Sequence, residues 1–170
     1  MILPTAYCGP KSYFEALMSE AATIEVMESF EKQTFRNRCL IRDPKGEIIR
    51  LTVPVGKVEH KQLTRDIEIS YQSKWQHQHW IAIESAYRHK PYFIYFADYL
   101  RPFYERQTKW LIDLNAGLTE TIVALLKKER PRLGSVSAAA RTHDWSGEIW
   151  TDKHPWQTEI SILDTLFDER

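Results

Sequence analysis

The spacing of apolar residues predicts that strands are concentrated in the first 70 residues of the chain. The clearest case is a hairpin, in which residues 38–42 and 48–55 flank the turn Asp43-Pro44-Lys45-Gly46, with proline at its second position. Apolar and polar residues alternate along 48–55, as they do in a half-buried strand. The expected strands are residues 1–5, 24–27, 38–42, 48–55, 67–69 and 133–137.

Helical spacing of apolar residues dominates after Ser73. The strongest pattern lies in residues 111–126, where leucine and isoleucine recur every three or four positions. The expected helices are residues 11–22, 74–88, 92–104 with a break near Pro102, 111–126 and 161–167, while residues 143–157 have no regular pattern. We therefore expect an α/β fold, with short strands and a hairpin in the N-terminal half and helices packed in the C-terminal half, formed by a single domain over residues 1–170.

Composition and charge argue against several classes of protein. The hydrophobic fraction of 43% and the mean hydropathy of −0.46 are ordinary for a globular domain, and no apolar run approaches the roughly 20 residues that span a bilayer. The first residues lack the basic start and apolar core of a signal peptide, so we expect a cytoplasmic protein without a membrane partner. Lysine plus arginine balances aspartate plus glutamate at 23 each, and no nucleic-acid-binding module is recognisable, so we expect no nucleic-acid partner.

Aromatic residues are the unusual part of the composition, at 12% of the chain. They fit a large aromatic core, and they also fit a pocket for a sugar ring or a nucleobase. The two cysteines, Cys8 and Cys39, lie far apart in the sequence and are expected to be reduced thiols that are at least partly buried.

The densest group of polar residues is the segment 32–39. If this segment is extended, Lys32, Arg36 and Arg38 point to one side, where they would bind a phosphate or carboxylate group. The alternative is a solvated edge strand, or cations that pair with Glu28 and Glu31 just upstream. Spacing alone slightly favours this alternative.

Sequence motifs for metals, phosphates and nucleophiles are absent. His77 and His79 are two positions apart on a predicted helix, so they point in different directions and cannot share a metal. The chain has no nucleophile elbow, no phosphate-binding loop and no dinucleotide-binding glycine pattern. We therefore expect neither a metal nor a cofactor. Cys8 follows the first strand, where α/β proteins often bind ligands, although a packing role is the more common one for such a thiol.

Several segments spread over nearly the whole chain form a specific combination. The most telling are the run from Lys32 to Cys39 and the strand Leu51-Thr52-Val53-Pro54-Val55. The other segments are Thr5-Ala6-Tyr7 with the following proline and Tyr13-Phe14, Trp75 to His79, Ala86-Tyr87-Arg88, Pro91-Tyr92-Phe93, Leu114-Asn115 and Ile160 to Phe167. Together these segments resemble the WbqC-like protein family. Where most of the family has glycine before the Tyr-Phe pair, this chain has Ser12.

The resemblance implies a role in the synthesis of cell-surface polysaccharide of the O-antigen type. Two functions fit this implication and the residues. The first is an enzyme with transferase-type activity on a phosphorylated or nucleotide-linked sugar. The second is a non-catalytic binding or assembly protein, a homo-oligomer included, that uses the aromatic helix at 92–104. In the enzyme, His79 is the expected general acid or base, and the expected ligand contacts are Tyr7, Lys32, Arg36, Asn37, Arg38 and Asn115.

Overall fold

The chain begins with a strand–helix–strand unit. In the computed structural model, β1 (Ile2–Pro4) and β2 (Thr23–Glu25) run parallel, and α1 (Lys11–Met18) lies between them in sequence. Parallel neighbours need such a crossover because a tight turn can join only antiparallel strands. The structure describes residues 2–18, 22–126, 132–133 and 159–168.

A third strand, β5 (Arg132–Leu133), completes the parallel sheet in the order β1-β2-β5. Ile24 of the central strand pairs with Leu3 on one side and Leu133 on the other. The sheet is short, and its first strand is buried along its whole length. The carboxyl end of β1 therefore leads directly into the interior of the molecule.

The predicted hairpin is formed by β3 (Arg38–Arg42) and β4 (Ile48–Thr52). Its turn is held by the Asp43 carboxylate, which accepts hydrogen bonds from the backbone N–H groups of Lys45 and Glu47. Gly46 adopts the left-handed conformation with φ of 88°, which glycine reaches without steric cost. This combination of an aspartate and a glycine fixes the register of the two strands.

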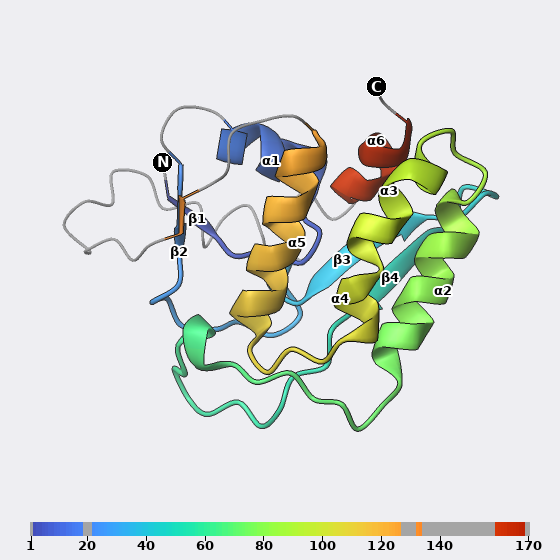
Figure 1. Ribbon diagram of the computed structural model, residues 1–170. Helices are drawn as coiled ribbons and strands as arrows, with labels where there is room; N and C mark the ends of the chain where they lie inside the picture. Colours follow the sequence, from blue (N-terminus) through green and yellow to red (C-terminus); the bar gives the residue numbers. More distant parts are fainter. Residues whose placement is uncertain (1, 19–21, 127–131, 134–158, 169–170) are drawn as a thin grey trace.

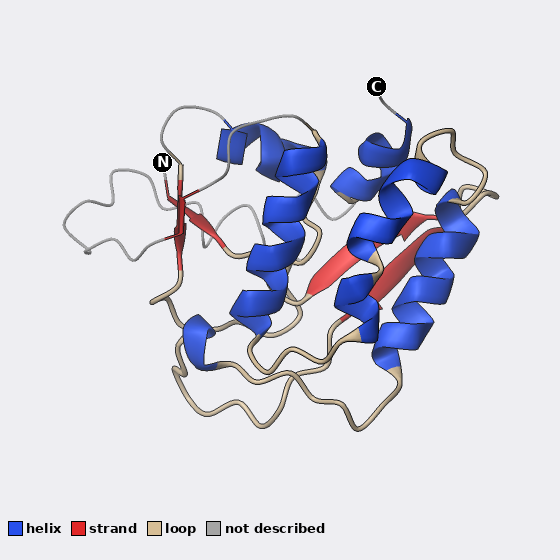
Figure 2. Cartoon of the chain, in the orientation of Figure 1, coloured by secondary structure: helices blue, strands red, loops and turns tan. Residues whose placement is uncertain are grey.

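The second half of the chain is helical, as the apolar spacing predicted. The 3₁₀ turn η1 (Thr64–Asp66) precedes the helices of this half. In Figures 1 and 2 the helices α2, α3 and α4 lie together on the right, around the hairpin, while α5 runs between the hairpin and the parallel sheet. These helices are α2 (Trp75–Tyr87), α3 (Phe93–Leu100), α4 (Pro102–Glu105) and α5 (Leu111–Leu125).

The last described element, α6 (Ile162–Asp168), packs against α1 and β3. Its buried Phe167 ring lies 5.1 Å from the rings of both Tyr87 and Phe93, measured between centroids. The hydrophobic core thus joins the first helix, the hairpin, the α2–α3 region and α6 in one cluster.

Most of the predicted elements are confirmed, and the exceptions are local. Residues 67–69 do not form a strand, because Glu68 and Ile69 make only isolated bridges, to Trp110 and Val55 respectively. The end of the predicted last strand and the irregular stretch 143–157 lie outside the described residues. Within the described part of the chain, no helix has the length and apolar character needed to cross a bilayer.

Candidate functional site

Two residues of the loop after β1 join buried polar side chains from two helices. The Tyr7 hydroxyl lies 2.8 Å from Nδ1 of His79 and 3.0 Å from the Tyr104 hydroxyl, and Cys8 Sγ lies 3.9 Å from the Tyr104 hydroxyl. We call these four residues the tyrosine–histidine cluster. They come from the β1–α1 loop, α2 and α4, and all four are buried.

His79 reaches the cluster because it lies on the buried face of α2. Trp75, His79 and Ile83 recur every four positions and point inward, whereas the neighbouring His77 is exposed. The imidazole of His79 also forms a hydrogen bond with the backbone of Thr52. This bond raises the pKa of His79, because a carbonyl acceptor favours the protonated imidazole. The Tyr7 hydroxyl donates its proton to the Tyr104 hydroxyl at 3.0 Å, and Nδ1 of His79 lies within hydrogen-bond distance of the same Tyr7 oxygen.

Burial decides the protonation states of the cluster. It lowers the pKa of His79 from 6.5 to about 4, despite the opposing effect of the Thr52 hydrogen bond. It also raises the pKa of Tyr7 and of Tyr104 above the ordinary value of 10, and raises the pKa of the Cys8 thiol to about 12. At neutral pH the cluster is therefore uncharged, His79 is a neutral imidazole, and Cys8 is a thiol rather than a nucleophilic thiolate.

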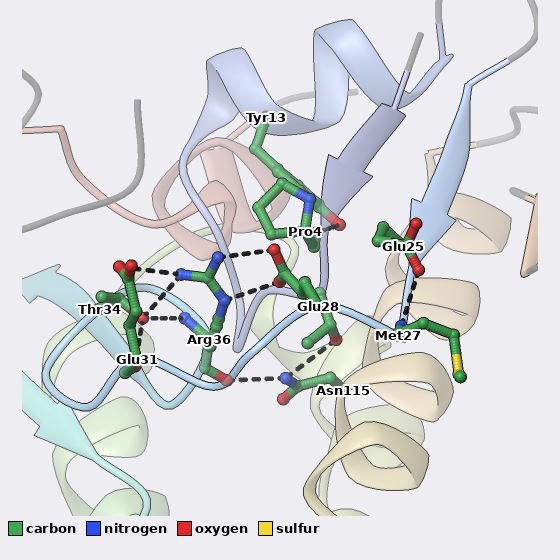
Figure 3. A network of polar contacts seen from close by, with 10 residues as sticks. Pro4, Tyr13, Glu25, Met27, Glu28, Glu31, Thr34, Arg36 and Asn115 are labelled. Carbon is green, nitrogen blue, oxygen red and sulfur yellow. Dashed lines mark hydrogen bonds and ion pairs between the residues drawn. The ribbon is translucent and has the colours of Figure 1, made fainter. Parts of the chain in front are cut away.

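A second polar group surrounds Arg36, which is only 2% exposed (Figure 3). Its Nε and Nη2 atoms donate to the two carboxylate oxygens of Glu28 at 2.7 Å and 2.8 Å, and Nη1 lies 3.9 Å from the Glu31 carboxylate. A guanidinium group held in this two-pronged way is a stable internal ion pair. Of the alternatives that the sequence left open, the structure has the pairing with Glu28 and Glu31.

The expected extended face of cations is not formed. Residues 32–37 are turns apart from an isolated bridge at Thr34, Gln33 has a φ of 62°, and the Asn37 N–H donates to the Thr34 carbonyl at 3.2 Å. Strand geometry begins only at Arg38, so the side chains of this segment do not alternate. Lys32 is exposed, while Arg36 turns inward to Glu28.

Arg38 has a separate environment at the start of β3. Its Nε donates to the Thr52 hydroxyl at 3.2 Å, and its Nη1 lies 3.5 Å from the Gln33 carbonyl. Thr52 therefore contacts Arg38 through its side chain and His79 through its backbone. This shared residue links Arg38 to the tyrosine–histidine cluster.

Two asparagines tie the loops together. Asn115 of α5 donates through Nδ2 to the Arg36 carbonyl at 2.7 Å and to the Thr5 hydroxyl at 3.1 Å (Figure 3). Asn37 donates to the Val53 carbonyl at 3.1 Å. The side-chain oxygens of both asparagines are buried without a hydrogen-bond partner, which is uncommon in a protein interior.

The structure thus brings together most of the residues expected from the sequence. The Tyr7 N–H donates to the Phe35 carbonyl at 2.8 Å, so the β1–α1 loop lies directly on the turn that carries Arg36 and Asn37. Lys32 lies apart on the surface. The sequence did not single out Tyr104 or Thr52 as partners of His79, and no local motif marks them. Among the described residues, no group of three or more histidines, cysteines or carboxylates is arranged to hold a metal ion.

Comparison with known proteins identifies a family. The model of the WbqC-like protein family matches residues 6–152, which include the β1–α1 loop, the hairpin and the helices α2 to α5. The chain belongs to the WbqC-like family. No curated protein and no solved structure matches it significantly. Both polar groups described above, including Glu28 and Tyr104, lie within the residues that this WbqC-like chain shares with the family model.

Proposed function

We propose that this WbqC-like protein is an enzyme of cell-surface polysaccharide biosynthesis that acts on a phosphorylated or nucleotide-linked sugar. The observation that carries the proposal is the gathering of Tyr7, Arg38, Asn37, His79 and Asn115 around the loop that follows β1. Ligands of α/β proteins commonly bind beyond the carboxyl ends of parallel strands. Family membership supports the class of substrate.

The proposal assigns each residue a role. Arg38 contacts the phosphate group, while Arg36, already paired with Glu28, positions the turn. The unpartnered oxygens of Asn37 and Asn115 accept hydrogen bonds from sugar hydroxyl groups. In a transfer to a hydroxyl acceptor, that hydroxyl gives its proton to the Tyr7 oxygen, while Tyr7 turns its own proton from Tyr104 to Nδ1 of neutral His79.

A thermal-shift screen against nucleoside diphosphates, nucleoside diphosphate sugars and sugar phosphates tests the proposal. A ligand at 100 times its dissociation constant stabilises the fold by about 2.7 kcal/mol, or roughly 5–10 °C for a domain of this size. Arg38→Ala should remove the shift, and Arg42→Ala is the matched control, because Arg42 lies on the same strand but is exposed. A blank panel, or equal loss with both variants, contradicts the proposal.

The alternative of a binding or assembly protein has its own observation. Ile94, Tyr95 and Tyr99 of α3 are 76%, 67% and 60% exposed, which is high for large apolar side chains so close together. Light scattering after size exclusion tests self-association through this helix. Tyr95→Ser should reduce the mass of an assembled species, whereas Ile81→Ser on α2 should not. A monomer at all concentrations removes the support for self-association.

A further inference from the structure

The helix α6 is attached to the loop that carries Tyr7 and Cys8. The Ser161 hydroxyl donates to the Cys8 carbonyl at 2.7 Å, and the Ile162 N–H donates to the Gly9 carbonyl at 2.9 Å. The Ser161 N–H donates to the Leu40 carbonyl of β3, also at 2.7 Å. Residues 161 and 162 therefore bind the β1–α1 loop and the hairpin at the same time.

The conformation of Cys8 depends on its surroundings. Its φ of 44° lies in the left-handed region, which costs a residue with a β-carbon about 1–2 kcal/mol. Such a conformation persists only where neighbouring contacts impose it. The hydrogen bond from Ser161 to the Cys8 carbonyl is one such contact, because it fixes the direction of the peptide group on the carboxyl side of Cys8.

α6 is a separate docking element. It has seven residues, which is too few for a helix to be stable in water on its own. Its helical structure comes from the burial of Leu163 and Phe167, both fully buried against the core. It also lies beyond residues 6–152, the part of the chain that matches the family. Docking of such an element is a cooperative local transition that is distinct from global unfolding.

We propose that α6 is a clamp that controls access to Tyr7 and Cys8. Docking of residues 161–168 holds the loop of residues 5–10 closed over the tyrosine–histidine cluster, and undocking opens it. Tyr7 and Cys8 are 0% and 2% exposed, so a molecule in solution reaches them only after the loop moves. The inference deepens the proposed function by adding control of the same site, but its test uses no ligand, so a blank ligand panel leaves it standing.

The first test measures alkylation of Cys8 and Cys39 by iodoacetamide, with the two thiols resolved by peptide mass spectrometry. Cys39 is an equally buried reference on β3, which α6 also contacts, so a rise in the ratio reports opening of the Cys8 loop beyond any exposure of the hairpin. Ser161→Ala should increase the ratio of the Cys8 alkylation rate to the Cys39 alkylation rate about fivefold, because the variant lacks one hydrogen bond that keeps the loop closed. A ratio that stays constant in Ser161→Ala overturns the proposal, whether both rates rise together or neither rises.

Tyr71→Phe is the matched control. The Tyr71 hydroxyl also donates to a backbone carbonyl and accepts from a backbone N–H, both at Thr108 and away from the loop. Ser161 does the same with Cys8 and Leu163. The clamp predicts that Tyr71→Phe leaves the ratio of rates unchanged. An equal rise in that ratio would mean that general destabilisation exposes Cys8, and would overturn the proposal.

The unmodified protein provides a second test, which does not depend on a variant. Hydrogen exchange at the Ile162 amide reports the undocking of α6, because that N–H is bonded to the Gly9 carbonyl. If undocking opens the loop, the Ile162 amide and the Cys8 thiol should be protected by the same factor, within about threefold. A Cys8 thiol that is far less protected than the Ile162 amide would show that the loop opens with α6 in place.

Discussion

The Tyr7 hydroxyl lies 2.8 Å from Nδ1 of His79, although 72 positions separate the two residues in the chain. The same hydroxyl lies 3.0 Å from the Tyr104 hydroxyl, so it links α2 to α4 through the loop after β1. In the buried interior a hydroxyl with two partners contributes to stability chiefly because its removal leaves those partners unsatisfied.

We therefore expect Tyr7→Phe to lower the free energy of unfolding by about 1–3 kcal/mol, since His79 and Tyr104 both lose a partner. Urea denaturation measures this difference. Tyr95→Phe is the control, because it removes the same hydroxyl from a side chain that is 67% exposed, and it should change stability by less than about 0.5 kcal/mol. Equal effects of the two substitutions would contradict the importance of the cluster.

The depressed pKa of His79 predicts a loss of stability in acid. The folded-state pKa is about 4 and the ordinary value is 6.5, so between these pH values the unfolded chain binds a proton that the folded chain does not. The contribution of His79 is fully present above pH 6.5 and falls as the pH drops toward 4, by up to about 3 kcal/mol. Urea denaturation from pH 4 to pH 7 measures the slope.

His79→Gln should flatten this pH dependence, whereas His77→Gln should not, because His77 is exposed on the same helix. Carboxylates that titrate in the same range affect all three proteins alike, so the difference between the slopes isolates His79. Parallel curves for the unmodified protein and His79→Gln would show that His79 is not responsible.

The ion pair of Arg36 with Glu28 should be strongly coupled. Glu28→Gln leaves a buried guanidinium opposite a neutral amide, and we expect a loss of about 3–5 kcal/mol in the free energy of unfolding. Glu105→Gln, which breaks an exposed pair with Arg101, should cost less than about 1 kcal/mol. Denaturation at neutral pH compares the two variants. A similarly small loss for both would mean that the ion pair of Arg36 with Glu28 contributes little to stability.

The hairpin turn depends on Gly46. An added β-carbon would meet no atom within 4 Å, so the cost of Gly46→Ala comes only from the φ of 88° and should be about 1 kcal/mol. Gly46→Asn should cost less, because asparagine tolerates this conformation. Gly56→Ala is the control, because its β-carbon would make an ordinary contact 3.7 Å from the Glu68 carbonyl. The thermal midpoints rank the three variants, and an unchanged midpoint for Gly46→Ala would contradict the argument.

Regular elements could be predicted from the sequence because their signals are local. The repeat of Leu111, Leu114, Leu118 and Ile122 marks the buried face of α5, and all four side chains are buried. The turn from Asp43 to Gly46 has its aspartate and its glycine at the positions that the hairpin needs. These patterns depend on residues within one or two turns of each other, so they need no knowledge of the fold.

The candidate site could be predicted only in part, because its contacts are long-range. His79 was singled out as the expected general acid or base, but its partners Tyr7 and Tyr104 come from other elements. The segment 32–37 has alternating polar residues that suit a strand, yet the pairing of Arg36 with Glu28 and the left-handed Gln33 favour turns instead. Alternation of residue types in the sequence is therefore compatible with a series of turns as well as with a strand.

The docking of α6 has a consequence for synthesis of the protein on the ribosome. The first strand and its loop leave the ribosome early, but the hydrogen bonds to the Cys8 and Gly9 carbonyls need Ser161 and Ile162. Domains fold as units during translation, at about 5–20 residues per second. The apolar residues of α1 and β3 on which α6 later packs therefore stay uncovered for several seconds. During that interval an apolar surface that is buried in the folded protein is exposed to solvent, and such exposure favours aggregation of the nascent chain.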